Sequence, residues 1–158
     1  MEYLEITPND YPVFLGLLNP YYREGEDAQT PQEEIDGFIR LLFDMVMQRK
    51  IFGCFAKDGG EIVGFSLWVV DTPDFAFSQM PGYGTVLEIG MIPACRAAGW
   101  GKALVSHAED CLRSKGAKQC YVSSYGPAQD FWARCGYAYS GQKADNGLPI
   151  MVKNIAAE

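Results

Sequence analysis

Apolar and polar positions along the chain follow two spacings, one alternating and one that recurs every three to four residues. The first spacing is typical of strands and the second of helices. We expect strands over residues 2–7, 51–58, 61–71, 85–93, 117–124, 137–141 and 148–155. We expect helices over residues 11–19, 31–50, 100–115 and 127–135. This order predicts an α/β fold, in which helices cover the faces of a sheet.

Proline, glycine and capping residues set the expected ends of these segments. Pro20 is predicted to end the first helix, because proline lacks the backbone N–H that a helix would use. Thr30 is followed by Pro31 and then by Glu33, which predicts a capping box at the start of the second helix. The glycine pair 59–60 lies between two β-rich runs and predicts the turn of a hairpin.

The length and charge of the chain narrow its class. With 158 residues it has the size of one domain, so we expect a single domain over residues 1–158. Residues 1–40 hold nine acidic and two basic side chains, a balance that equals the net charge of −7 of the whole chain. An acidic first quarter argues against a nucleic-acid partner and suits a cationic ligand, and a merely solvated acidic surface explains it equally well.

Neither a membrane span nor a metal site is indicated. No apolar run has the length of a membrane span, and the start, MEYLEITPND, has neither the basic segment nor the apolar stretch of a signal peptide. We therefore expect a cytoplasmic protein without a membrane partner. The five cysteines have no CxxC spacing, so we expect buried, reduced thiols and no metal ion.

Residues 93–105, PACRAAGWGKALV, form a glycine-rich turn that opens into a predicted helix, a pattern that can bind a phosphate group. A P-loop is excluded, because Arg96 stands at its first glycine and Ala103 at its magnesium-binding hydroxyl. A dinucleotide fingerprint is excluded, because Leu104 stands at its third glycine. The remaining pattern, R-x-x-G-x-G over residues 96–101, predicts a site for an anion such as a pyrophosphate.

A second motif, AQDFWARCGY, follows over residues 128–137. Arg96, Gly99 and Gly101 match motif A of the GNAT superfamily of acyl-CoA-dependent N-acetyltransferases, which the chain resembles. Pro93 stands where that family commonly has proline, and the second motif resembles the family's motif B, A-x-x-[FL]-Y-x-x-x-G-[FY]. The resemblance implies a mixed, mostly antiparallel central sheet flanked by helices, within a single domain.

The same resemblance implies acetyl-CoA as the co-substrate, without a metal. Backbone groups of Met91 and Ile92 would hold its pantetheine arm, and the amides of residues 97–102 would bind its pyrophosphate. The side chain of Trp100 is expected on the surface or beside the adenine. The expected coenzyme-binding residues are Met91, Ile92, Arg96, Ala97, Ala98, Gly99, Trp100, Gly101, Lys102 and Phe131.

Acyl transfer from a thioester to an amine needs a base for the amine, a donor for the oxyanion and an acid for the departing thiolate. Glu88, among apolar neighbours in a predicted strand, is the candidate base, and a solvent-facing Glu88 fits the alternation equally well. Trp132 stands where motif B has tyrosine, and an indole N–H cannot act as a general acid. Tyr125 is the candidate acid, with Ser123, Ser124 or unassisted departure as alternatives.

His107 is the only histidine, and it lies four residues before Cys111 in the predicted third helix. Such a pair offers two ligands where a zinc site needs four, and a cysteine inside a helix has little access as a nucleophile. We interpret both residues as structural.

Two segments, residues 19–30 and 71–85, are expected to flank the acceptor, because loops on that side vary within the family. Both combine acidic and aromatic side chains, which suit an amine through ion pairing and cation–π contact, and a solvated surface loop explains each residue equally well. The residues concerned are Tyr21, Tyr22, Glu24, Glu26, Asp27, Asp74, Phe75, Phe77 and Tyr83.

The resemblance that these motifs carry implies an N-acetyltransferase that moves an acetyl group from acetyl-CoA to a primary amine by direct attack. The acceptor is a small amine or an amine of a peptide or protein, and it is expected to be cationic. A homodimer is compatible with the sequence. The alternative is a non-catalytic acyl-CoA-binding or regulatory domain that kept motif A and lost the acid of motif B.

Overall fold

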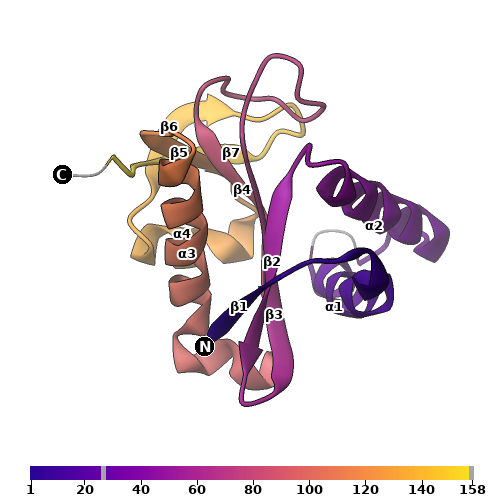
Figure 1. Cartoon of the computed structure of the whole chain (residues 1–158). Coiled ribbons are helices and arrows are strands. Elements are labelled where there is room, and N and C mark those ends of the chain that lie inside the picture. Colours follow the sequence, from indigo (N-terminus) through magenta and orange to yellow (C-terminus); the bar gives the residue numbers. More distant parts are fainter. Residues whose placement is uncertain (26–27, 157–158) are drawn as a thin grey trace. The chain divides into compact units, whose positions relative to one another are not determined.

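The computed structural model of the chain describes residues 1–25 and 28–156. Within this part, seven strands form one sheet in the order β1-β2-β3-β4-β5-β7-β6, accompanied by four α-helices (Figure 1). The strands are β1 (Glu2–Glu5), β2 (Phe52–Asp58), β3 (Glu61–Val70), β4 (Gly84–Met91), β5 (Gln119–Ser123), β6 (Ala138–Lys143) and β7 (Pro149–Asn154). The helices are α1 (Tyr11–Glu24), α2 (Gln32–Met47), α3 (Trp100–Ser114) and α4 (Gln129–Arg134). None of these described helices is long and apolar enough to cross a membrane.

The predicted order of strands and helices is confirmed, as is the α/β class with a mixed, mostly antiparallel sheet. Strand β4 runs parallel to β5, whereas β1 with β2, β5 with β7 and β6 with β7 are antiparallel. The chain divides into two compact units: unit 1 comprises Met1–Leu67 and Glu88–Gly101, and unit 2 comprises Trp68–Leu87 and Lys102–Glu158. Strands β3 and β4 contribute to both units, and the single domain over residues 1–158 stays a prediction.

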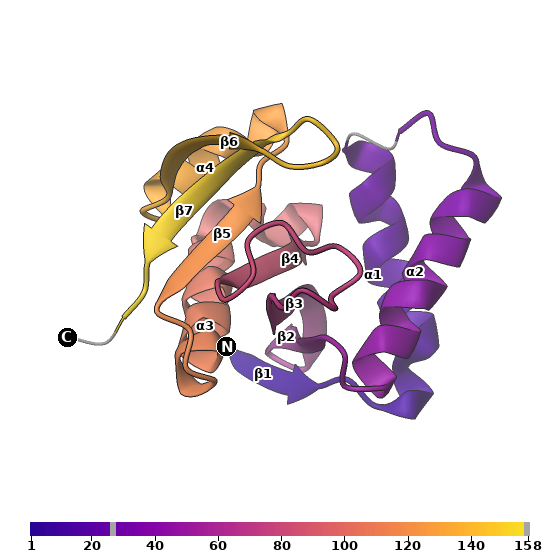
Figure 2. The same ribbon diagram turned by 90° about the horizontal axis from the view of Figure 1, so that it is seen from above.

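Unit 1 contains β1, β2, one part each of β3 and β4, and the helices α1 and α2, which lie side by side (Figure 2). The two helices join through aromatic rings, since Phe43 of α2 packs edge-on against Tyr11 and Phe14 at centroid distances of 5.1 and 5.4 Å. The predicted hairpin between β2 and β3 is confirmed. Its turn residues, Gly59 and Gly60, have φ values of 58° and 99°, which favour glycine.

Helix α1 continues past Pro20 and ends at Glu24, so the predicted end at Pro20 is wrong. Proline removes one helical hydrogen bond and crowds the preceding turn, which costs about 3 kcal/mol. The last turn of α1 forms nevertheless, because the packing of its aromatic side chains stabilises it. Tyr22 is 7% exposed, and the ring of Tyr21 packs edge-on against Phe65 of β3 at 5.4 Å. Tertiary packing therefore outweighs the local helix-breaking signal.

Helix α2 begins at Gln32 with Pro31 as its N-cap and without a side-chain capping bond, so the capping box predicted at Thr30 is wrong. Arg23 of α1 organises this end of α2 instead. Its Nη1 donates to the Thr30 carbonyl at 2.7 Å, and its Nη2 donates to Oε1 of Gln32 at 2.7 Å. A side chain of α1 therefore fixes the position of the chain at the start of α2.

Unit 2 contains the other parts of β3 and β4, the strands β5, β7 and β6, and the helices α3 and α4. Strand β4 pairs with β5 where Gly84 lies opposite Cys120. A buried carboxylate, Glu109 of α3, ties this helix to the sheet. It is 3% exposed and accepts hydrogen bonds from the Tyr137 hydroxyl at 2.7 Å and from Nζ of Lys153 of β7 at 2.9 Å.

A second buried carboxylate of unit 2, Asp71, organises the loop between β3 and β4. Its Oδ2 accepts from the backbone N–H groups of Gln79 (2.9 Å) and Met80 (2.8 Å) and from the hydroxyl of Tyr121 (2.7 Å). Burial by itself raises the pKa of Asp71, but these bonds and one from Ser78 outweigh burial and hold the pKa below its ordinary value. The ionised carboxylate therefore fastens the loop to β5.

Replacing Asp71 by asparagine is expected to lower the free energy of unfolding by about 2–4 kcal/mol near neutral pH, because an amide loses the negative charge that these hydrogen-bond donors share. The contribution of the carboxylate is complete above the ordinary pKa of 3.8 and is lost as the pH falls through the lower pKa of the folded state. Urea unfolding near neutral pH and at about pH 3 should therefore show the difference from wild type shrinking in acid. A difference that stays constant with pH would contradict this role of the charge.

Candidate functional site

The glycine-rich turn between β4 and α3 has a backbone shape that glycine permits. It is a 3₁₀ turn, Pro93–Ala98, and Ile92 before it is extended (φ −59°, ψ 147°), as a residue before proline prefers. Gly99 ends the turn with φ 76°, in the left-handed region where a side chain is strained. A Cβ on Gly99 would meet no atom of the described residues within 4 Å. A ligand can therefore approach the backbone at this point.

Helix α3 starts directly after Gly99, at Trp100. The first N–H groups of a helix have no acceptor within it, and the helix dipole makes this end partly positive. Lys102 in the first turn is exposed, and Gly101 beside it carries no side chain. Free N–H groups at a helix start are the kind of group that binds anions, and the pyrophosphate site at this turn stays a prediction.

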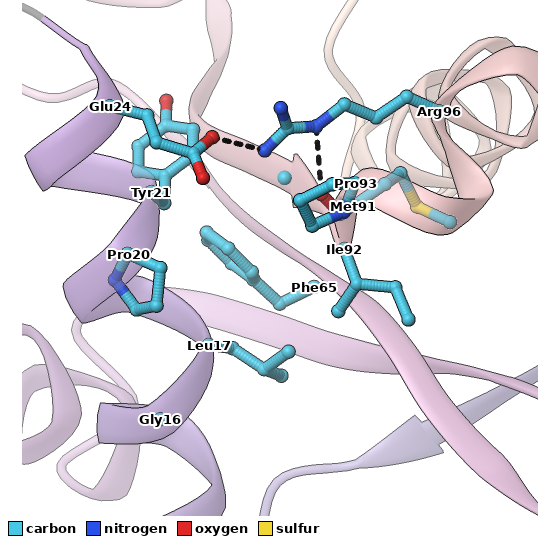
Figure 3. Close-up of a pocket in the computed structure, with 11 residues that line it drawn as sticks. Gly16, Leu17, Pro20, Tyr21, Glu24, Phe65, Met91, Ile92, Pro93 and Arg96 are labelled. Carbon is cyan, nitrogen blue, oxygen red and sulfur yellow. Dashed lines mark hydrogen bonds and ion pairs between the residues drawn. The ribbon is translucent and has the colours of Figure 1, made fainter.

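Arg96, the charged side chain of the turn, is held by two contacts within unit 1 (Figure 3). Its Nε donates to the carbonyl of Met91 at 3.2 Å, and its Nη2 donates to Oε2 of Glu24, the last residue of α1, at 2.5 Å. The side chains of Arg96 and Glu24 are 51% and 46% exposed, so water screens the pair, which contributes about 1 kcal/mol or less. An anion at the turn can compete with Glu24 for the guanidinium.

The backbone of Met91 and Ile92 is predicted to hold the pantetheine arm. Some of its N–H and carbonyl groups already form hydrogen bonds within unit 1. The Ile92 N–H donates to the carbonyl of Val63 at 2.8 Å, and the Ile92 carbonyl accepts from the N–H of Cys95 at 2.9 Å. The Met91 carbonyl accepts from Arg96. Because successive residues of a strand direct their N–H groups to opposite edges, we expect the Met91 N–H to point away from Val63 and β3.

A pocket of unit 1 lies beside the turn, between α1 and the end of β4 (Figure 3). Its volume is about 80 Å³, several times the room that one water molecule needs. Most of its walls are apolar, and the Arg96–Glu24 pair lies at one end of it. The lining residues are Gly16, Leu17, Pro20, Tyr21, Glu24, Phe65, Gly90, Met91, Ile92, Pro93 and Arg96.

Gly90 of β4 brings the aromatic walls of this pocket close to the strand. A Cβ on Gly90 would lie 2.7 Å from Cε1 of Phe65 and 2.9 Å from Cδ1 of Tyr21, which is closer than side chains pack. The sequence does not predict Leu17, Phe65 or Gly90 as site residues. Of these three residues only Gly90 carries a signal in the sequence, because a glycine inside a strand marks a close approach.

Glu88, the predicted base, lies in β4 within unit 1 and is half-buried. Tyr125, the predicted acid, lies in unit 2 after β5, and its carbonyl accepts from the N–H of Ala128 at 2.8 Å. Of the other hydroxyls that the sequence leaves open, Ser124 is fully buried and Ser123 is exposed. The assignment of base and acid stays a prediction.

Trp132, which stands in place of the motif B tyrosine, is a core residue of unit 2. It is 6% exposed, and its ring packs edge-on against Phe131 and Tyr137, each at a centroid distance of 5.2 Å. Phe131 is half-buried in α4, and its predicted contact with the coenzyme stays a prediction. The packing of Trp132 gives this position a structural role.

His107 and Cys111 lie one turn apart in α3, as predicted, with Nε2 and Sγ separated by 3.9 Å. The imidazole packs edge-on against Trp68 at 5.9 Å. Burial lowers the pKa of His107 and raises the pKa of Cys111, so both are neutral near pH 7. In the part of the chain that the structure describes, no three His, Cys, Asp or Glu side chains gather as a metal site would require.

The two predicted acceptor segments differ in what they contribute. From the first segment, Tyr21 and Glu24 line the pocket of unit 1, whereas Tyr22 is buried. Glu26 and Asp27 lie outside the described residues. The second segment belongs to unit 2. Its Asp74 is exposed, Phe75 packs edge-on against Phe77 at 5.6 Å, and Tyr83 packs against Tyr121 at 6.4 Å.

Solved structures of acetyltransferases share the fold of this chain. PaiA N-acetyltransferase from Thermoplasma acidophilum, in complex with coenzyme A, is 16% identical with a TM-score of 0.73, over 97% of this chain and 98% of that chain. A GNAT-family acetyltransferase from Staphylococcus aureus Mu50 is 11% identical with a TM-score of 0.74, over 98% of both chains. A GNAT-family acetyltransferase from Brucella melitensis, in complex with acetyl-CoA, is 15% identical with a TM-score of 0.68, over 99% of this chain and 89% of that chain.

No curated protein matches the chain in sequence, but the sequence model of one family does. The model of the acetyltransferase (GNAT) family matches residues 13–137, which is most of the chain and includes both motifs. This chain therefore belongs to the GNAT family of acetyltransferases.

Proposed function

We propose that this chain transfers the acetyl group of acetyl-CoA to a primary amine by direct attack of the amine on the thioester. Membership of the family supports acetyl transfer, and the Thermoplasma and Brucella structures contain coenzyme A and acetyl-CoA. The observation that carries the proposal is the turn at residues 96–102. There the open, left-handed backbone of Gly99 meets the first N–H groups of α3.

The residues of the turn fit the coenzyme. The N–H groups of residues 97–102 would bind the pyrophosphate, with Arg96 and Lys102 adding positive charge. The N–H of Met91 would hold the pantetheine arm, since the N–H of Ile92 is already bonded to Val63. When bound, acetyl-CoA supplies a thioester whose carbonyl carbon is the electrophile of the reaction.

The side chains of the protein would move the protons. An alkyl ammonium has a pKa of about 10.4, so near neutral pH it must lose a proton before it attacks. We assign this proton to Glu88, directly or through water, and we assign to Tyr125 the proton that the departing sulfur takes up. A C–N bond forms as the C–S bond breaks, so an ammonium and acetyl-CoA give an amide, the free thiol of coenzyme A and a proton.

One observation favours a second candidate, a non-catalytic domain that binds acyl-CoA. The tyrosine of motif B is replaced by Trp132, and this ring is packed in the core of unit 2. The proton donor that the resemblance implies is therefore missing at that position.

Thiol release from acetyl-CoA separates the two candidates. The protein is incubated with acetyl-CoA and a panel of alkylamines, diamines, amino-acid amides and lysine peptides, and each acetylated product is identified by mass spectrometry. We expect at least one amine to release thiol in equal amount to its acetylated product. Saturable binding of acetyl-CoA without turnover of any amine would favour the non-catalytic candidate. Preference for ATP over coenzyme A would contradict both.

A further inference from the structure

We propose that Arg96 and Glu24 form a switch operated by the coenzyme. The pyrophosphate takes over Arg96, and the released carboxylate of Glu24 then binds the ammonium group of a monoamine whose apolar body occupies the neighbouring pocket. This inference rests on the proposed function and adds to it a binding site for a second ligand, an apolar monoamine, and an order of binding. Arg96, Glu24 and the residues that line the pocket all lie in unit 1.

The position of Glu24 makes its carboxylate depend on a nearby cation. It is the last residue of α1, where the helix dipole places partial negative charge, so an unpaired carboxylate is unfavourable there. In the free protein the cation is the guanidinium of Arg96 at 2.5 Å. A carboxylate that loses this partner would bind another cation that reaches the same end of the pocket.

The position of Arg96 allows it to exchange Glu24 for the pyrophosphate. Arg96 belongs to the turn that is predicted to bind the pyrophosphate. The two phosphate groups of a pyrophosphate carry one negative charge each, so together they offer the guanidinium more negative charge than the single carboxylate of Glu24 does. The competing pair with Glu24 is half-exposed, so the free energy that resists the exchange is small. The Nε bond to the Met91 carbonyl can remain while Nη2 changes its partner.

The walls of the pocket select what the freed carboxylate can bind. Leu17, Pro20, Phe65 and Ile92 make an apolar space, and Glu24 and Arg96 are the charged side chains among the residues that line it. Once the pyrophosphate holds Arg96, the pocket presents one carboxylate beside apolar walls. This arrangement suits a ligand with one ammonium group and an apolar body, whereas a second charge in the body would be buried without a partner.

Isothermal titration with coenzyme A, which lacks the acetyl group and permits no turnover, tests the switch. Pentylamine is the probe amine, and 1,4-diaminobutane has the same length with a second charge. In the wild-type protein we expect saturating coenzyme A to tighten pentylamine binding about two- to five-fold, the size of a half-exposed ion pair. We expect 1,4-diaminobutane to bind at least about ten-fold more weakly than pentylamine under the same conditions.

The variant Glu24→Gln removes the charge that the switch moves. We expect it to bind coenzyme A about two- to five-fold more tightly than wild type, because Arg96 no longer has a competing partner. Its pentylamine affinity should be weak whether or not coenzyme A is present. The matched control is Glu33→Gln, an exposed glutamate in the first turn of α2 outside the pocket, which should behave as wild type.

Three results would overturn the switch while leaving the proposed function intact. In the first, Glu24→Gln binds coenzyme A with the same affinity as wild type. In the second, the affinity of the wild-type protein for pentylamine is the same with and without coenzyme A. In the third, pentylamine and 1,4-diaminobutane bind with equal affinity. Absence of coenzyme A binding in the wild-type protein would instead remove the proposed function, and the switch with it.

Discussion

Replacing Gly101 by glutamate is expected to abolish the binding of coenzyme A and to leave the fold intact. Gly101 lies in the first turn of α3, where the predicted pyrophosphate approaches the backbone. A carboxylate there would repel the pyrophosphate at short range, which predicts a loss of affinity of at least about 100-fold. The same carboxylate suits the positive end of the helix, so the melting temperature should stay the same or rise. Titration calorimetry and thermal unfolding of one preparation measure both effects.

A second glutamate in the same helix separates the local effect from the added charge. Ser106 of α3 is exposed and lies beyond the first turn, so Ser106→Glu should bind coenzyme A nearly as wild type does. If a folded Gly101→Glu variant bound coenzyme A with undiminished affinity, the pyrophosphate site would have to be elsewhere.

Replacing Glu88 by glutamine is expected to lower kcat about 100-fold or more near neutral pH without weakening the binding of acetyl-CoA, because a glutamine cannot accept the proton of the ammonium. The deficit should shrink as the pH approaches the pKa of the amine, since the free amine then needs no base. The measurement is kcat against pH for both proteins, on an acceptor found with the amine panel.

The control for this variant is Glu61→Gln, an exposed glutamate at the start of β3, which should keep the wild-type profile. A pH profile of Glu88→Gln that matches wild type at every pH would remove Glu88 as the base. The proton would then have to pass through another group or to solvent directly.

The turn could be predicted from the sequence because its information is local. Pro93 fixes an extended residue before it, Gly99 supplies the left-handed backbone, and the apolar stripe after Gly101 defines a helix start. The hairpin at residues 59–60 follows from the same kind of signal. The family resemblance then adds the coenzyme, which no local pattern identifies.

The sequence names Tyr21 and Glu24, which line the pocket, but it does not predict the pocket itself, because its walls are brought together by contacts between residues far apart in the sequence. Local rules end the first helix at Pro20, whereas the packing of Tyr21 against Phe65 carries α1 on to Glu24. Only this extra turn brings Glu24 to Arg96, which lies 72 positions later in the chain. Composition indicates that the first quarter is acidic, but it does not indicate which acid meets a cation.

The most direct test of the central claim is a map of the backbone amides of the ¹⁵N-labelled protein during titration with acetyl-CoA. The account predicts saturable binding in which the N–H signals of Gly99, Gly101 and Lys102 shift most, together with that of Met91. Saturable binding that leaves these four signals in place and shifts amides elsewhere would contradict it.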